Sequence, residues 1–150
     1  MALELRLVSP DVATALAELF AALRASGDER HFHPHPLDDE TARAVAGRST
    51  KDLYYVAIDD DRALAYAMLR GWDEGYDVPS LGIAVHPDER GTGVARLMME
   101  TLHEAARRRG ATSIRLKVYL DNEAAIRLYR SLGYMFDGEE DGQVVGRLEL

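Results

Sequence analysis

The sequence contains no cysteine, which excludes disulfide bonds, thiolate nucleophiles and cysteine-ligated metal centres. It lacks any apolar run near the roughly 18 residues that a membrane-spanning helix needs. The first residues carry neither the basic region nor the apolar stretch of a secretory signal. No repeat, low-complexity segment or Gly/Ser/Pro-rich linker divides the chain. These absences predict a single domain over residues 1–150, located in the cytoplasm.

Positive charge is also scarce in this chain. Lys and Arg total 18 against 26 Asp and Glu, which gives a formal net charge of -8. Nucleic acids and anionic membranes attract proteins that carry a basic field, so we expect neither as a partner. Hydrophobic residues at 47% and charged residues at 29% are typical of a globular protein with a packed core. A small anionic ligand bound by a few local groups stays compatible with this charge.

Hydrophobic patterning predicts the order of the helices and strands. Leucines alternate with charged residues over 3–7, as in a half-buried strand, and apolar residues recur at helical spacing from Val12 to Leu23. The resulting order βααβββαβαββ predicts an α+β fold, a mostly antiparallel mixed sheet with helices on both faces. The further elements are a helix over 38–47, strands over 53–58, 63–69 and 81–85, a helix over 93–110, a strand over 114–118, a helix over 122–133, and strands over 134–136 and 143–150.

The junction from Val85 to Ala95, where a strand leads through glycines into a helix, is the sharpest local signal. Gly91 and Gly93 allow a tight turn that brings backbone N–H groups close to a ligand. A helix that begins near Gly93 directs unpaired N–H groups and partial positive charge toward the same point, where phosphate binds well. Arg90 adds a cation that can pair with phosphate oxygens. The P-loop and dinucleotide fingerprints fit less well, and a plain strand-to-helix turn is the alternative.

The segment Val85–Ala95 follows the pattern V-x-P-x-x-R-G-x-G-x-A, and Asn122–Tyr134 follows N-x-x-A-x-x-L-Y-x-x-x-G-Y. In this order, separated by one helix and one strand, the two motifs resemble those of the GNAT superfamily of N-acetyltransferases. The resemblance covers the chain from about Leu53 to Tyr134. It implies an enzyme with the GNAT-like acyl-CoA N-acyltransferase fold that uses acetyl-CoA.

The resemblance also implies which residues bind acetyl-CoA. Backbone amides of the glycine turn would hold the pyrophosphate, and the strand before it would bind the pantetheine arm where two strands separate. Asn122 would hydrogen-bond that arm. Tyr129 would act as the general acid that protonates the departing thiolate. The residues so implied in cofactor binding are Ile83, Ala84, Val85, Arg90, Gly91, Thr92, Gly93, Val94, Ala95, Asn122 and Tyr129.

Acyl transfer needs a neutral amine nitrogen, so the reaction also requires a proton acceptor. Some peptide-modifying relatives place a glutamate in the strand before the second motif, where this sequence has Lys117. The lysine disfavours a ribosomal protein or a peptide N-terminus as the acceptor. The candidate bases are the carboxylates Asp73, Glu74 and Asp77, acting directly or through water, or a histidine of the first half.

The stretch 31–36 holds three of the five histidines and two prolines. In GNAT-like folds, the segment between the first two helices lines the acceptor pocket, so His33 and His35 are candidate acceptor-binding residues. A plain loop and a metal site are the alternatives. No metal is expected, because no nearby Asp/Glu spacing completes a ligand set.

The loop 71–77 is a second candidate for acceptor binding. It joins the aromatic rings of Trp72 and Tyr76 to the carboxylate of Asp73, a combination that suits a cationic amine on an apolar or sugar-like body. A solvent-exposed hairpin loop is the alternative.

The sequence therefore predicts direct transfer of acetyl from acetyl-CoA to a primary amine, in a ternary complex and through a tetrahedral intermediate. Without a cysteine or a serine motif, no acyl-enzyme is expected. The expected acceptor is a small molecule: an amino sugar, a nucleotide-linked amino sugar, a polyamine or an antibiotic amine. Acetylation of protein lysines or N-termini and a non-catalytic acyl-CoA-binding sensor are the alternatives. Many relatives are dimers, so a homodimer is one assembly that the resemblance allows.

Overall fold

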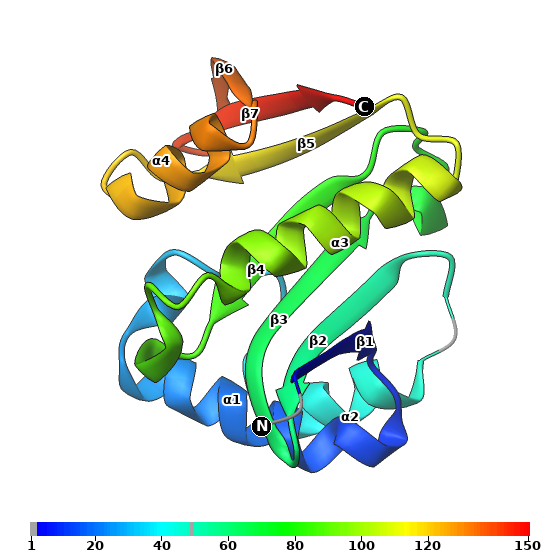
Figure 1. Ribbon diagram of the computed structural model, residues 1–150, viewed down its shortest axis with the longest axis vertical. Coiled ribbons are helices and arrows are strands. Elements are labelled where there is room, and N and C mark those ends of the chain that lie inside the picture. The colour runs from blue at the N-terminus through cyan, green and yellow to red at the C-terminus, as the bar shows by residue number, and fades with distance from the viewer. Residues whose placement is uncertain (1–2, 49) are drawn as a thin grey trace.

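The computed structural model describes residues 3–48 and 50–150, which contain a seven-stranded sheet (Figure 1). Its strands lie in the order β1-β2-β3-β4-β5-β7-β6. Neighbouring strands are antiparallel except β4 and β5, which run parallel, so the mixed and mostly antiparallel sheet is confirmed. The strands are β1 Leu3–Leu7, β2 Leu53–Asp59, β3 Arg62–Arg70, β4 Ser80–Val85, β5 Ser113–Val118, β6 Met135–Glu140 and β7 Gln143–Glu149.

The helices occupy the positions that the sequence predicts. Helix α2 begins where expected, because the Asp38 carboxylate accepts a hydrogen bond from the Thr41 backbone N–H at 2.8 Å. Helix α3 ends before Gly110, whose φ of +85° is the left-handed conformation that favours glycine. In the part of the chain that the structure describes, the α-helices are α1 Ala13–Ala25, α2 Asp39–Gly47, α3 Val94–Arg108 and α4 Glu123–Ser131.

Helices cover both faces of the sheet because its central strand is apolar on both sides. Residues 63–69 of β3 are all buried, as expected for a strand with packing partners above and below. Tyr66 and Met68 belong to the cluster formed with α1 and α2. Ala65 and Leu69, which point to the opposite face, belong to the cluster formed with α3 and α4.

Strands β4 and β5 diverge along their length (Figure 1). Their ladder pairs Ser80 with Arg115, and the Arg115 N–H donates to the Pro79 carbonyl at 3.0 Å. No further pair joins the two described strands, so the backbone of residues 81–85 that faces β5 is left for water or a ligand. The divergence divides the sheet into β1–β4 and β5-β7-β6.

The final hairpin differs from the prediction in its extent. Strand β6 runs to Glu140, whereas the sequence predicts a strand over 134–136 only. Its second half is polar and exposed, so no hydrophobic alternation marks it, and a bulge between Phe136 and Glu139 keeps it paired with β7. The Phe136 ring packs over Gly146, where an added Cβ would lie 2.8 Å from the ring.

A buried hydrogen bond joins α3 to the start of β6. His103 Nε2 lies 2.7 Å from the Tyr134 hydroxyl, and both residues are buried. Burial, assisted by the charge of Arg107, lowers the pKa of His103 to about 4. The imidazole is therefore neutral near pH 7 and packs as part of the core.

We expect acid to destabilise the fold through His103. In the unfolded chain this histidine takes up a proton below about pH 6.5, while the folded chain resists protonation until about pH 4. The free energy of unfolding should therefore fall as the pH falls through this window, by roughly 2–3 kcal/mol between pH 7 and pH 4.5. Urea unfolding of wild type and His103→Gln at both pH values measures the effect. His35, whose pKa burial also lowers, adds a slope of the same sign to both proteins. Equal slopes in wild type and His103→Gln would contradict the role of His103.

Candidate active site

The turn between β4 and α3 is built on two glycines with positive φ. Gly91 has a φ of +78° and Gly93 a φ of +89°, which L-residues with side chains rarely adopt. A Cβ added at either position would meet nothing within 4 Å, so the space in front of the turn is open. Gly93 is the N-cap of α3 and offers no side-chain acceptor. The N–H groups of the first helical turn therefore lack an intrahelical partner and remain available to an anion.

Side chains hold this turn in place from its flanks. Arg90 forms an ion pair with Asp28, which lies in a short 3₁₀ helix after α1, and more than half of the Arg90 side chain is exposed. The Thr92 hydroxyl donates to the Glu89 carbonyl at 2.6 Å. An exposed pair of this kind contributes only about 0–1 kcal/mol, so Arg90 can exchange its carboxylate partner for a phosphate at little cost.

The strand before the turn brings the other predicted cofactor residues to the diverging edge. Ile83 and Val85 are half-buried against the α3/α4 cluster, while Ala84 is buried on the α1/α2 face. Val94 is buried in the first turn of α3 and Ala95 beside it is half-buried. The side chains of Ile83, Val85 and Val94 therefore belong to one cluster, beside the edge of β4 that diverges from β5.

Asn122 lies at the start of α4, directly after β5. It is the N-cap residue of the helix, but its side chain makes no capping hydrogen bond and is half-buried. Its amide is therefore not committed to the helix, which is consistent with a role in hydrogen-bonding a ligand.

Tyr129 is a buried side chain of α4 in the same cluster as the first turn of α3. Its ring lies 5.9 Å from the ring of Tyr134, centroid to centroid. Burial raises the pKa of Tyr129 to about 12, so the hydroxyl is protonated at neutral pH and can donate. Among the described residues, no hydrogen-bond partner is found for that hydroxyl.

The 28–35 segment, which connects α1 to α2, bridges the two diverging strands. On its β5 side, His31 Nε2 lies 3.0 Å from Asp121 Oδ1, and His33 Nε2 lies 2.9 Å from the Tyr119 hydroxyl. Both partners belong to the loop between β5 and α4. Since the first residue of the segment pairs with the glycine turn after β4, the segment spans the open ends of both strands.

His35 makes different hydrogen bonds from His33 and contacts β3 rather than the loop after β5. Its Nδ1 donates to the Pro36 carbonyl and its Nε2 accepts from the Tyr66 hydroxyl, both at 2.8 Å. Burial lowers its pKa, with a further contribution from nearby arginine charges. His35 therefore anchors the segment to β3, while the exposed His33 lies at the mouth between the diverging strands.

The structure does not bring the loop 71–77 to the glycine turn. The loop precedes β4 and the turn follows it, so the two lie at opposite ends of that strand. Trp72 stacks against the guanidinium of Arg109 at 4.9 Å, just beyond the last residue of α3. A helix of 15 residues places this end about 22 Å from the turn.

Asp73 has a structural function in that loop. Its carboxylate accepts hydrogen bonds from the backbone N–H groups of Lys51 at 2.8 Å and Asp52 at 3.3 Å. These bonds lower the pKa of Asp73, which makes it a poorer base. Glu74, Tyr76 and Asp77 are exposed in the same loop. The loop therefore lies away from the glycine turn, and the roles of Asp73, Glu74 and Asp77 as candidate bases and of Trp72, Asp73 and Tyr76 in acceptor binding stay predictions.

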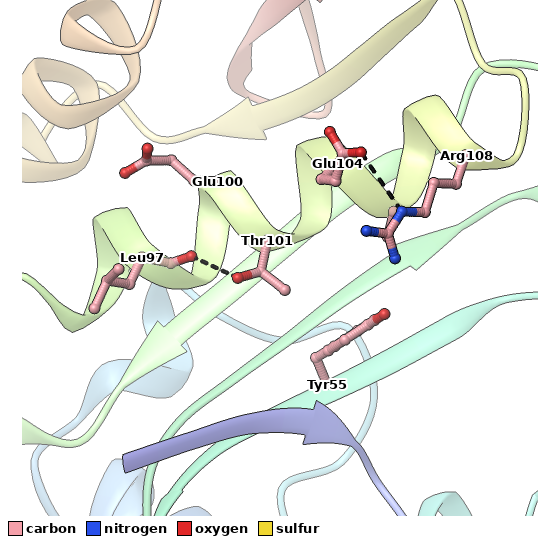
Figure 2. Close-up of a pocket in the computed structure, with 7 residues that line it drawn as sticks. Tyr55, Leu97, Glu100, Thr101, Glu104 and Arg108 are labelled. Carbon is pink, nitrogen blue, oxygen red and sulfur yellow. Dashed lines mark hydrogen bonds and ion pairs between the residues drawn. The ribbon is translucent and has the colours of Figure 1, made fainter.

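A separate groove of about 400 Å³ lies between α3 and β2 (Figure 2). Tyr55 of β2 forms one side. On the α3 side, the Thr101 hydroxyl donates to the Leu97 carbonyl at 2.9 Å, and Glu104 pairs with Arg108 at 3.5 Å. None of the predicted cofactor or acceptor residues lines this groove, so it is distinct from the candidate site.

Within the described part of the chain, no helix is long and apolar enough to cross a membrane. No group of three His, Cys, Asp or Glu residues suited to a metal ion is found there either. The expectations of no metal, a cytoplasmic location and a homodimer all stay predictions.

Several residues at the mouth of the site are paired with partners far away in the sequence, and local patterns did not predict these pairs. Asp28 pairs with a residue 62 positions away, and the partners of His33 and His31 are 86 and 90 positions away. No local pattern encodes such pairings. The concentration of histidines in 31–36 is the one sequence signal that pointed to this part of the site.

Comparisons with known proteins agree with this geometry. The model of the acetyltransferase (GNAT) family matches residues 16–134. The ribosomal protein bS18-alanine N-acetyltransferase of Escherichia coli K12 is 42% identical over 106 residues, 71% of this chain and 69% of that protein. A GCN5-related N-acetyltransferase from Kribbella flavida has a TM-score of 0.80 at 25% identity, covering 99% of this chain and 98% of that chain. The PaiA N-acetyltransferase of Thermoplasma acidophilum, solved in complex with coenzyme A, has a TM-score of 0.82 at 14% identity over 100% of both chains.

Gly91→Val and Gly93→Val are expected to weaken acetyl-CoA binding by about 10-fold or more while the fold is retained. A β-branched residue is strained at positive φ, so the turn must change shape and redirect its N–H groups, and the loss of one or more such bonds is worth this factor. Gly75 is a matched control, because it has the same φ of +89° as Gly93 and open space around it. Calorimetric titration with acetyl-CoA should show wild-type affinity for Gly75→Val. Equal affinity in all three variants would contradict the prediction that the glycine turn binds acetyl-CoA.

Proposed function

Because the chain belongs to the acetyltransferase (GNAT) family and is therefore an acyltransferase, we propose that it transfers the acetyl group of acetyl-CoA to a primary amine of a small-molecule acceptor. The observation that supports this most strongly is the divergence of β4 from β5 directly before an open glycine turn. The divergence leaves the backbone edge of one strand unpaired beside N–H groups suited to phosphate.

The residues present fit acetyl-CoA as a substrate. The amides of residues 91–95 and the guanidinium of Arg90 suit its pyrophosphate, and the unpaired edge of residues 83–85 suits the amide groups of its pantetheine arm. Asn122, on the facing side of the divergence, has a free amide for the same arm. When bound, acetyl-CoA supplies an acetyl thioester whose sulfur is the leaving group.

The transfer forms one C–N bond and breaks one C–S bond. The lone pair of the amine nitrogen forms the new bond, the electron pair of the C–S bond stays with sulfur, sulfur gains a proton and nitrogen loses one. Tyr129 suits the role of proton donor, because its hydroxyl is protonated at neutral pH and has no competing acceptor among the described residues. Among the candidate bases, His33 lies at the mouth of the divergence, and we assign it to accept the amine proton directly or through water.

A small molecule is the acceptor that the site supports best. Lys117 stands on β5 where some peptide-modifying relatives have a glutamate, so this chain lacks the carboxylate that would attract a peptide ammonium there. Acetylation of a protein N-terminal alanine is the second candidate, favoured by the 42% identity to the bS18-alanine N-acetyltransferase.

Tyr129→Phe is expected to lower kcat by about 100-fold, the low end of the usual contribution of a positioned acid, while the Kd for acetyl-CoA changes less than about threefold. Tyr55→Phe, in the groove beside α3, is the matched control and should retain wild-type kcat. A Tyr129→Phe enzyme with normal turnover would remove the general-acid assignment.

The function itself is tested by thiol release from acetyl-CoA in the presence of an amine panel that includes amino acids, amino sugars, polyamines and a peptide with the N-terminal alanine of bS18. Release that depends on a small amine supports the proposal. Release with the peptide alone supports the second candidate, and binding of acetyl-CoA without turnover on any amine supports a sensor.

A further inference from the structure

Arg70 is a half-buried cation at the end of β3 that has no carboxylate partner. Its guanidinium donates to the Pro34 carbonyl at 3.0 Å. No carboxylate of residues 3–48 or 50–150 lies within 4.0 Å of it. In a chain with 26 acidic residues against 18 basic ones, a partly desolvated arginine left without a carboxylate indicates room for an anionic ligand.

The strand register places Arg70 on the acceptor side of the site. Arg70 pairs with Ser80, and Ser80 is the residue of β4 that pairs with Arg115 of β5. Residues that pair directly share one face of a sheet, so the three form a row at the point where the strands begin to diverge. The bond from Arg70 to Pro34, within the 28–35 segment, shows that this is the face covered by that segment.

The opposite wall of the divergence is also basic. Lys117 lies two residues beyond Arg115 on the same face of β5. Arg115 pairs with Glu140 and Lys117 with Asp141 at 3.1 Å, both at the exposed end of the β6–β7 hairpin. Such exposed pairs are weak, about 0–1 kcal/mol, so neither carboxylate is firmly fixed. Three cations therefore surround the start of the divergence, and Arg70 is the one whose guanidinium has only a carbonyl as acceptor.

This charge distribution is the reverse of the one expected from sequence. Arg70 lies on the face covered by the 28–35 segment, whereas Trp72 of the acidic loop 71–77 lies on the opposite face, against Arg109 after α3. We propose that the acceptor amine carries a carboxylate close to its amino group, as an α-amino acid does, and that Arg70 binds this carboxylate. The planar guanidinium matches a carboxylate with two parallel hydrogen bonds. Neighbouring cations also disfavour the ammonium form of the acceptor and so favour the neutral nitrogen that reacts. The inference rests on the proposed acetyl transfer and adds the class of acceptor.

The experiment compares the proteinogenic amino acids with their methyl esters as acceptors, using thiol release from acetyl-CoA. An ester has the same side chain and a more readily deprotonated amine, so chemistry alone favours the ester. For the accepted amino acid, wild-type kcat/KM should exceed that of its ester by about 10-fold or more. Arg70→Gln should lower kcat/KM for the free acid by about 10- to 100-fold and leave the ester within about threefold, because a charge-assisted bond is lost. The affinity of Arg70→Gln for the N-acetylated amino acid, measured by calorimetry, should be lower than that of wild type by the same factor.

Two further variants keep the test informative. Arg70→Lys retains the positive charge but lacks the planar guanidinium. Its kcat/KM for the free acid should therefore lie between the values of wild type and Arg70→Gln. Arg108→Gln removes an exposed arginine of α3 and should leave the acid-to-ester ratio unchanged. A ratio near one in wild type, or a ratio that survives in Arg70→Gln, overturns the inference. Acetylation of polyamines or amino sugars without any amino acid overturns it as well but leaves the proposed function standing, whereas acetylation of the bS18 peptide alone, or failure to bind acetyl-CoA, removes both.

Discussion

The divergence of β4 from β5 is the constraint on which the rest of the structure depends. A central pair of strands joined at one position gives up ladder hydrogen bonds, so other contacts must hold the two parts of the sheet together. On one face, the cluster under α3 and α4 does this, since it contains Leu69 of β3, Leu116 of β5 and Met98 of α3. A continuous apolar core therefore replaces the missing backbone bonds.

The opposite face is joined by polar contacts instead. The 28–35 segment reaches the glycine turn through Asp28 and the loop after β5 through His31 and His33. These pairs are at least partly exposed, and such contacts are individually weak. One side of the divergence is thus fixed by burial, and the other is closed by weak polar pairs. That asymmetry is what an enzyme needs if two substrates must enter, meet and leave without unfolding the sheet.

The sequence was sufficient for the order of elements and for the glycine turn between β4 and α3, because both are local. Periodicity, the Asp38 cap and the glycines at 91 and 93 depend on neighbours within a few residues. It was insufficient for the second half of β6, which is exposed and carries no hydrophobic pattern. The position of the loop 71–77, at the other end of β4 from the glycine turn, also follows from local sequence, because the loop precedes this strand and the turn follows it. The unpaired Arg70 and the contacts of the 28–35 segment depend on strand register and were beyond local patterns.

A crystal structure of the wild-type protein with acetyl-CoA tests the account most directly. We predict the pyrophosphate against the amides of residues 91–95, with Arg90 released from Asp28, and the pantetheine arm along residues 83–85 between β4 and β5. Such a structure would confirm that the divergence exists to admit this substrate. A pyrophosphate bound elsewhere, such as in the groove beside Tyr55, or a β4–β5 edge that stays empty with acetyl-CoA bound, would contradict the account.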